Sequence, residues 1–245
     1  MRRVLVAGNW KMNGTRVSVE ELLTGLVDAT ASAEIVVCPA AIHISQVAAR
    51  CTGSEIQVGA QDCSHMASGA FTGEIAAPML TDMGCDWVVL GHSERRQYHA
   101  ESDATVAAKL TAAVDAGLKP IVCVGETLEQ RKLGVADSVV ASQLAGALEG
   151  QASLAGLVIA YEPVWAIGTG LTATPEQAQD MHEFIRARLA QVTGVDAAAT
   201  RVLYGGSVKS SNAVTLFSQA DIDGALVGGA ALDAQEFRLI IAAAQ

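Results

Sequence analysis

The chain has 245 residues, of which 51% are hydrophobic and 17% are charged, and its formal net charge is −10. This composition excludes a disordered chain and supplies the apolar material for one large core. The acidic balance argues against a nucleic-acid binder, which would carry a basic stripe. No apolar run approaches the roughly 18 residues of a spanning helix, and the apolar stretch after Met1 is too short for a signal peptide. We therefore expect a soluble cytoplasmic protein that binds neither nucleic acid nor membranes.

Eight short apolar runs recur along the chain. They are too uniformly apolar for half-exposed antiparallel strands, and they are typical of parallel strands that are covered on both faces. The runs are residues 4–8, 35–38, 56–60, 87–91, 120–125, 157–162, 201–205 and 224–228.

Helix signals lie between these runs. Ser18 with Glu21 predicts a capping box at the start of the first helix. Thr174 predicts another helix start, because proline follows it at the first helical position. The sequence therefore alternates between strands and helices from its first run onward.

The same alternation continues to the end of the chain. Residues 103–117 carry apolar side chains on one helical face and end in a glycine that suits a helix stop, and Asp233 with Glu236 opens a last helix. Eight β–α alternations without a break in composition favour an α/β fold in which eight parallel strands, ringed by helices, close into a (β/α)₈ barrel. An open doubly wound sheet is the alternative, because periodicity alone does not show closure.

The sequence carries no motif for a metal or a nucleotide cofactor. Its five cysteines are scattered without a Cys-x-x-Cys pair, which argues against a disulfide framework or a zinc site. It also contains no P-loop, no dinucleotide fingerprint after a strand and no His/Asp cluster at metal-ligand spacing. We expect reduced thiols, no metal and no cofactor, with Cys123 packed in the core.

Polar residues that could carry chemistry follow the predicted strands, where a barrel of this kind places its active site. Lys11 follows the first run, and in an acidic protein we expect this cation to contact an anionic ligand rather than to be a solvated surface charge. His92 follows the fourth run at the start of a helix. The helix dipole disfavours the imidazolium, so we expect a neutral ring that donates a hydrogen bond to a carbonyl.

Glu162 closes the sixth run in apolar surroundings. Burial there is expected to raise the pKa of its carboxyl group toward that of a useful general base. The alternative is a buried carboxylate paired with an arginine or lysine. The next residues, 163–170, combine an initial proline, Trp165, Ile167 and two glycines. This pattern predicts a lid that moves over a pocket.

Glycine pairs follow the last two runs, at 205–206 and 228–229. Each pair alone is typical of a turn. Two pairs after the seventh and eighth strands, where barrels often bind phosphate, favour a cradle of backbone amides for an anion.

Five segments, taken in order from the first predicted strand to the last, together resemble the triosephosphate isomerase family. The segments that contain Glu162 and His92 are the most specific of these. The resemblance implies a single TIM-barrel domain over residues 1–245. It also implies cofactor-free interconversion of dihydroxyacetone phosphate and D-glyceraldehyde 3-phosphate through an enediolate, in glycolysis and gluconeogenesis. The five segments are residues 8–14, 91–96, 160–170, 204–208 and 226–230.

The resemblance also implies catalytic roles. Glu162 would take the proton next to the carbonyl and return it to the neighbouring carbon. His92 would polarise the carbonyl and move protons between the two oxygens. Lys11, with Asn9 beside it, would hold the substrate and offset its charge. Glu94 would orient the site, and its neighbour Ser93 is a second supporting residue.

Further residues would bind the phosphate, largely through backbone amides, namely Gly168, Ser207, Gly228 and Gly229. The sequence departs from the family pattern at Leu171, where many members carry lysine after the lid. We expect this difference to affect lid motion rather than the reaction.

Residues 61–74 form a connection that is long for a barrel, and long connections tend to be functional. Met66 and Phe71 would give a monomer an exposed apolar tip. In the family that the chain resembles, this loop packs beside the first catalytic loop of the other subunit, which implies that Thr72 lies near Lys11 across an interface. We therefore expect a homodimer through residues 61–74.

Two other functions are alternatives for a barrel that binds a phosphate. A sugar-phosphate epimerase on a similar barrel would commonly need a metal or paired aspartates at strand ends, which this sequence lacks. A non-catalytic phosphosugar-binding barrel would not need Glu162 and His92 together.

Overall fold

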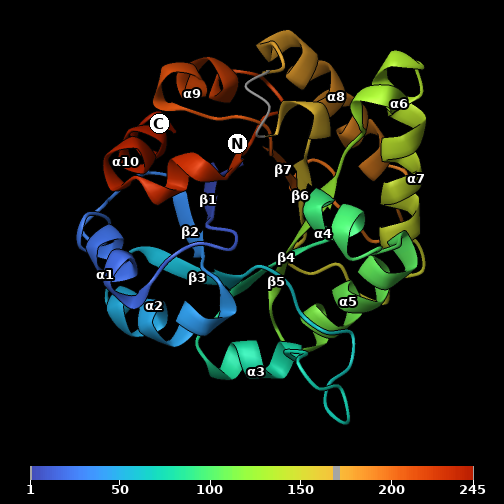
Figure 1. The fold of residues 1–245 in the computed structure, drawn as a ribbon. Coiled ribbons are helices and arrows are strands. Elements are labelled where there is room, and N and C mark those ends of the chain that lie inside the picture. The colour runs from blue at the N-terminus through green and yellow to red at the C-terminus, as the bar shows by residue number, and fades with distance from the viewer. Residues whose placement is uncertain (1, 168–171, 245) are drawn as a thin grey trace.

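The computed structural model describes residues 2–167 and 172–244. Within these residues, eight parallel strands pair in chain order, and the last pairs back with the first to close a barrel (Figure 1). The closed barrel is therefore confirmed, and the open sheet was the wrong alternative. Each strand lies within one residue of its predicted start. The strands are β1 (Leu5–Asn9), β2 (Glu34–Cys38), β3 (Ile56–Ala60), β4 (Trp87–Leu90), β5 (Lys119–Val124), β6 (Val158–Tyr161), β7 (Arg201–Tyr204) and β8 (Gly224–Val227).

Helices surround the strands on the outside of the barrel (Figure 1). In the described part of the chain, no helix is long and apolar enough to cross a membrane. The α-helices are α1 (Arg16–Thr24), α2 (Ile44–Cys51), α3 (Ala77–Asp82), α4 (Ser93–Tyr98), α5 (Asp103–Asp115), α6 (Leu128–Lys132), α7 (Ala136–Leu148), α8 (Pro175–Leu189), α9 (Ser210–Phe217) and α10 (Ala234–Ala242). Short 3₁₀ helices are η1 (Ala41–His43), η2 (Val164–Ala166) and η3 (Gly229–Leu232).

The strands bury side chains on both faces, which explains their continuous apolar sequence. One set of alternating positions forms a cluster inside the barrel, and the other packs against the helices. The barrel is therefore a filled core, and ligands are restricted to its ends. The inner cluster consists of Leu5, Ala7, Val36, Cys38, Trp87, Val89, Ile121, Cys123, Val158, Ala160, Leu203 and Leu226.

The first helix begins earlier than the sequence predicted. Thr15 is the N-cap of α1, and its side chain accepts from the Ser18 backbone N–H at 3.2 Å, while the Ser18 hydroxyl oxygen accepts from the Thr15 N–H at 2.9 Å. Placing the cap at Ser18 was wrong, because the Thr15–Ser18 pair closes its own capping box one turn earlier. The predicted cap at Thr174 is confirmed, with Gln177 as its reciprocal partner.

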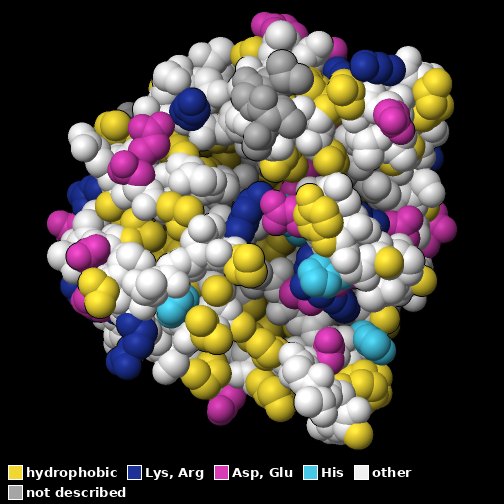
Figure 2. Space-filling model, in the orientation of Figure 1, with side chains coloured by type: hydrophobic (Ala, Val, Ile, Leu, Met, Phe, Trp, Pro, Cys, Tyr) yellow, Lys and Arg dark blue, Asp and Glu magenta, His cyan; other side chains and the backbone are white. Residues whose placement is uncertain are grey.

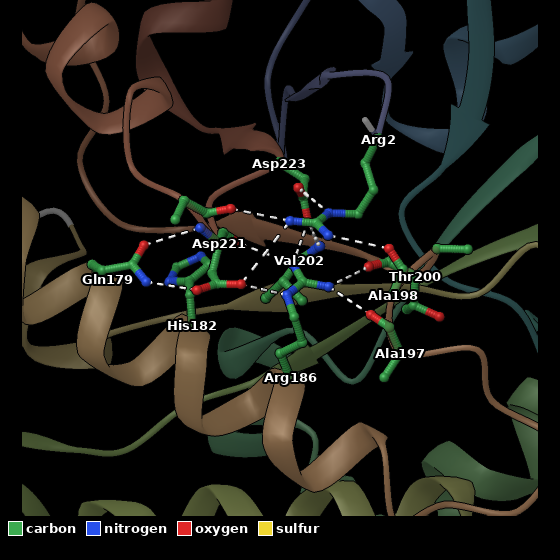
Figure 3. A network of polar contacts seen from close by, with 12 residues as sticks. Arg2, Gln179, His182, Arg186, Ala197, Ala198, Thr200, Val202, Asp221 and Asp223 are labelled. Carbon is green, nitrogen blue, oxygen red and sulfur yellow. Dashed lines mark hydrogen bonds and ion pairs between the residues drawn. The ribbon is translucent and has the colours of Figure 1, made fainter.

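The amino-terminal end of the barrel carries a partly buried ion-pair network (Figure 3). Asp223, which directly precedes β8, accepts from Arg186 of α8 at 2.6 Å, from Arg2 at 2.5 Å and from the Val202 N–H of β7 at 2.9 Å. Arg186 also reaches Asp221 at 2.6 Å. The network joins β7, β8, α8 and the start of the chain at the end opposite the carboxyl ends of the strands.

The connection over residues 61–74 projects beyond the ring of helices between β3 and α3 (Figure 1). Phe71 is 43% exposed in this connection, as expected for an apolar tip. Hydrophobic side chains also gather on the surface around α3 in the same view (Figure 2).

Candidate active site

A cavity of about 610 Å³ opens at the carboxyl ends of the strands, as the barrel prediction required. Figure 2 views the molecule from this end, where basic and acidic side chains meet around a hollow near the centre. The cavity brings together residues that follow β1, β4, β7 and β8. Its lining includes Asn9, Lys11, His92, Ile167, Gly205, Gly206, Ser207, Gly228 and Gly229.

Lys11 enters this cavity from the turn after β1. Its backbone has a φ of 53°, in the left-handed region that residues other than glycine rarely adopt. Its backbone N–H donates to the side-chain oxygen of Asn9 at 3.0 Å, and its ammonium group pairs with the carboxylate of Glu94 on α4. Asn9 is 5% exposed, so a buried side chain holds the backbone of the turn that carries the Lys11 ammonium group.

His92 is the N-cap of α4, and its two ring nitrogens have different partners. Nδ1 accepts from the Glu94 backbone N–H at 3.2 Å, and Nε2 lies 3.0 Å from Oε1 of Glu162. A nitrogen that accepts carries no proton, so the ring proton belongs on Nε2, which faces the carboxylate.

Burial lowers the pKa of His92, but the Glu162 carboxylate, with Glu94 behind it, outweighs burial and raises the pKa above its ordinary value. The expected lowering of the pKa by the helix dipole is therefore wrong for this arrangement, because α4 has only six residues whereas the carboxylate is in direct contact. The geometry still leaves Nε2 as the hydrogen-bond donor, because Nδ1 accepts from the Glu94 N–H. Burial favours the neutral ring again once the carboxylate moves away.

Glu162 directly follows β6 and is 2% exposed. Its Oε2 accepts from the Ser93 backbone N–H at 2.8 Å, and its Oε1 accepts from the Ser93 hydroxyl at 3.1 Å. Burial raises the pKa of this carboxyl group, but the contacts with His92 and Ser93 outweigh burial and lower it. The predicted rise was wrong for this rotamer, because three donors stabilise the charged form. The carboxylate of Glu162 contacts a histidine and a serine, and the expected alternative of an arginine or lysine partner is not what the structure shows.

The carboxylate of Glu162 lies outside the 610 Å³ cavity that Lys11 and His92 line. It lines a neighbouring cavity of about 540 Å³ instead, together with Ser93 and Trp165. To reach a ligand beside Lys11, the side chain must rotate past His92.

The glycine pairs have different structural roles. A Cβ at Gly205 would lie 3.0 Å from Cγ of Glu162, and one at Gly206 would lie 2.3 Å from the Tyr204 hydroxyl, so the first pair makes room for these side chains. A Cβ at Gly229 would meet nothing within 4 Å, so the backbone there faces open space. The second pair is the better candidate for an anion cradle.

The predicted lid is only partly within the described residues. Its first turn is η2, Ile167 lines the cavity, and the Ser207 hydroxyl donates to the Ala166 carbonyl at 2.7 Å. Two positions with predicted roles, Gly168 and Leu171, lie outside the described residues.

Sequence reasoning missed Glu126, which follows β5 and is fully buried. Its Oε1 accepts from the indole N–H of Trp165 at 2.8 Å, from the Tyr161 hydroxyl at 3.1 Å and from Arg131 at 3.1 Å. It thereby anchors the start of the segment that follows Glu162. The available signal was its position, because a charged residue directly after a buried strand belongs to the same end of the barrel.

The thiol of Cys123 is packed in the core and does not face the cavity that Lys11 and His92 line. Cys123 is fully buried, and burial raises its pKa well above the ordinary value, as expected of a packed thiol. Residues 2–167 and 172–244 contain no group of three His, Cys, Asp or Glu side chains placed to hold a metal ion.

Comparison with known proteins gives full-length matches. The family model described as triosephosphate isomerase matches residues 4–244. The triosephosphate isomerase of Ectopseudomonas mendocina is 52% identical over 249 residues, covering 100% of this chain and 99% of the relative. That of Pseudomonas fluorescens is 54% identical over 249 residues with the same coverage, and that of Thiobacillus denitrificans is 53% identical over 246 residues, again with 100% and 99% coverage.

Proposed function

Because the chain belongs to the triosephosphate isomerase family and interconverts dihydroxyacetone phosphate with D-glyceraldehyde 3-phosphate, we propose a role in this reaction for each side chain of the site. The enzyme is an isomerase of glycolysis and gluconeogenesis, so the epimerase and non-catalytic alternatives are set aside. We take residues 1–245 as one domain that acts in the cytoplasm. The proposed chemistry uses no metal or cofactor.

The substrate occupies the 610 Å³ cavity. Its phosphate lies at the backbone amides of Ser207, Gly228 and Gly229, with Gly168 as a fourth contact, because amide donors can bind an anion without a cluster of cations. Its carbonyl oxygen lies toward the other end of the cavity, between the ammonium of Lys11 and Nε2 of His92.

Glu162 is the general base. After rotating out of its contact with Ser93, the carboxylate takes a proton from the carbon next to the carbonyl. The C–H electron pair becomes the carbon–carbon double bond of the enediolate, and negative charge moves onto the carbonyl oxygen. The protonated carboxyl then returns the proton to the neighbouring carbon, which completes the isomerisation.

His92 and Lys11 stabilise the enediolate. The Nε2–H of His92 donates to the oxygen where charge develops and moves protons between the two oxygens. The Lys11 ammonium offsets the charge, and Asn9 holds the Lys11 backbone. Glu94 orients both groups, because its carboxylate pairs with Lys11 and its backbone N–H donates to Nδ1 of His92.

We also propose that the partner of this chain is a second copy of itself. Met12, directly after Lys11, is 94% exposed, and Phe71 of the 61–74 connection is 43% exposed. Apolar side chains so exposed in two loops are typical of a surface that another subunit covers. In an isologous dimer, Thr72 of one subunit would lie near Lys11 of the other, and each subunit would support its neighbour's site.

The observation that carries the assignment is that base, electrophile and cation meet within two adjoining cavities, with Nε2 of His92 3.0 Å from Glu162. The test is Glu162→Gln in a coupled assay with each triose phosphate, with and without a chelator. We expect kcat to fall by on the order of 10²- to 10⁴-fold while a phosphate-bearing inhibitor still binds. A loss of only about tenfold, roughly 1.4 kcal/mol, would contradict the assigned base. Chelator-sensitive turnover would contradict the metal-free route.

A further inference from the structure

The backbone of Lys11 is held in its left-handed conformation from both sides. On one side its N–H donates to the side chain of Asn9 at 3.0 Å. On the other side its carbonyl accepts from Nε2 of Gln61, the residue directly after β3, at 2.9 Å. The φ of 53° at a lysine is a conformation that persists only when neighbouring groups impose it.

Gln61 makes a second hydrogen bond with the same nitrogen. Its Nε2 also donates to the Cys38 carbonyl at the end of β2, at 2.9 Å. That carbonyl in turn accepts from the Trp10 N–H at 3.0 Å. A single amide group therefore ties the Lys11 carbonyl to the end of β2, beside the point where Trp10 already meets that strand.

We propose that Gln61 is a positioning residue for the reaction, acting through Lys11. The inference rests on the proposed role of Lys11 and extends it. The ammonium of a lysine is carried on a long flexible stem, so its place in the cavity depends on where the backbone starts and in which direction it leaves. Gln61 fixes the position of the Lys11 backbone, and the carboxylate of Glu94 fixes the position of its ammonium group.

The amide is suited to this task and a hydrophobic residue is not. Two carbonyl oxygens converge on one position, and an –NH₂ group offers two N–H donors to meet them. Without this donor, the carbonyl of the half-buried Lys11 and that of the buried Cys38 each lose a partner, and the Lys11 peptide is free to relax out of the left-handed region.

The test compares Gln61→Leu with a matched control, Gln57→Leu. Gln57 lies on β3, the strand that Gln61 directly follows, and its amide bonds to Glu34 and Trp87 rather than to the loop after β1. We expect Gln61→Leu to lower kcat/KM by about ten- to a hundredfold and to weaken binding of 2-phosphoglycolate, a phosphate-bearing carboxylate that resembles the enediolate. The control Gln57→Leu should retain kcat/KM and 2-phosphoglycolate binding, while its thermal stability falls by about as much as that of Gln61→Leu. Equal kinetic losses in the two variants would overturn the proposal.

A double-mutant cycle shows whether the effect passes through Lys11. In a Lys11→Met background, Gln61→Leu should cause little further loss of turnover or of 2-phosphoglycolate affinity, because the group that it positions is already gone. Additive losses would overturn the proposal, as would losses that track dissociation of the dimer in light scattering at the assay concentration. If Lys11→Met itself is fully active, the proposed role of Lys11 is wrong. If Lys11→Met is inactive and Gln61→Leu is not, only the role of Gln61 is wrong.

Discussion

His92 and Glu162 hydrogen-bond to each other, with Nε2 and Oε1 3.0 Å apart, before either contacts a substrate. The contact raises the pKa of the imidazole and lowers that of the carboxyl group, against the effect of burial on each. The two groups therefore titrate as a pair, and the reaction requires that they separate. The carboxylate then loses the donors that stabilise its charge and becomes a stronger base as it enters the cavity.

Replacing Ser93 tests this account of the base. Ser93→Ala removes the hydroxyl that donates to Glu162 at 3.1 Å but keeps the backbone donor. Because a hydrogen bond to the charged form lowers a pKa, its loss should raise the pKa of the Glu162 carboxyl in the free enzyme. The acidic limb of the kcat/KM profile should move to higher pH. Ser138→Ala, which removes an exposed hydroxyl bonded to its own helix, is the control, and an identical profile for both variants would contradict the account.

Lys11→Met should reduce kcat/KM by about 100-fold or more, the range measured for the loss of one group that stabilises an oxyanion. It removes a cation that lines the cavity of a protein with a net charge of −10. The affinity for 2-phosphoglycolate should fall in the same variant. A variant with near-normal turnover and inhibitor affinity would show that Lys11 is a surface charge.

Shortening the connection between Met66 and Gly73 tests the dimer and leaves Gln61 in place. The intact protein should scatter light with about twice the 25.3 kDa mass of one chain. The shortened variant should be monomeric and much less active, because the turn that carries Lys11 would lose its neighbour. A fully active monomer would contradict this prediction.

Asp223→Ala should lower the free energy of unfolding by about 3 kcal/mol, because it removes the 6% exposed carboxylate that pairs with both Arg186 and Arg2 and leaves Asp221 as the remaining carboxylate beside Arg186. Since the network lies at the end opposite the cavity, kcat of the folded enzyme should change little. Asp28→Ala, which breaks an exposed pair with Arg238, is the control and should unfold like the parent in urea. Equal stabilities of the two variants would contradict the role of the network.

His182 should make the protein less stable in mild acid. It is fully buried and contacts Tyr161 edge-on, and burial lowers its pKa to about 4 from 6.5. The folded state therefore binds fewer protons than the unfolded chain between these values. Stability should be constant above pH 6.5 with respect to this group and should fall as the pH drops toward 4, by about 3 kcal/mol in total.

The comparison that isolates this effect is His182→Asn, measured by urea unfolding from pH 7 to pH 4.5. The variant should be less stable overall, but its stability should depend less steeply on pH than that of the parent. Parallel curves would show that His182 does not titrate in this range.

The sequence by itself determined the strands and the residues at their ends. A strand buried on both faces must be apolar along its length, so all eight strands could be predicted from short stretches of sequence. The family resemblance followed from the polar segments that come directly after these strands. The capping box at Thr174 could also be predicted from the sequence, because its hydrogen bonds join residues only three positions apart.

Only the tertiary structure decided which partners these residues meet. Ser93 and Glu162 are 69 positions apart, and Gln61 and Lys11 are 50 apart, so their hydrogen bonds depend on how the closed barrel places β3, β4 and β6. The sequence correctly placed a carboxylate in apolar surroundings but predicted the wrong direction for its pKa. Burial is a local property of a strand end, whereas the three donors that outweigh it come from another strand's loop. The left-handed backbone of Lys11 could not be predicted from the sequence either, because the side-chain amide of Gln61, directly after β3, holds the Lys11 carbonyl in place.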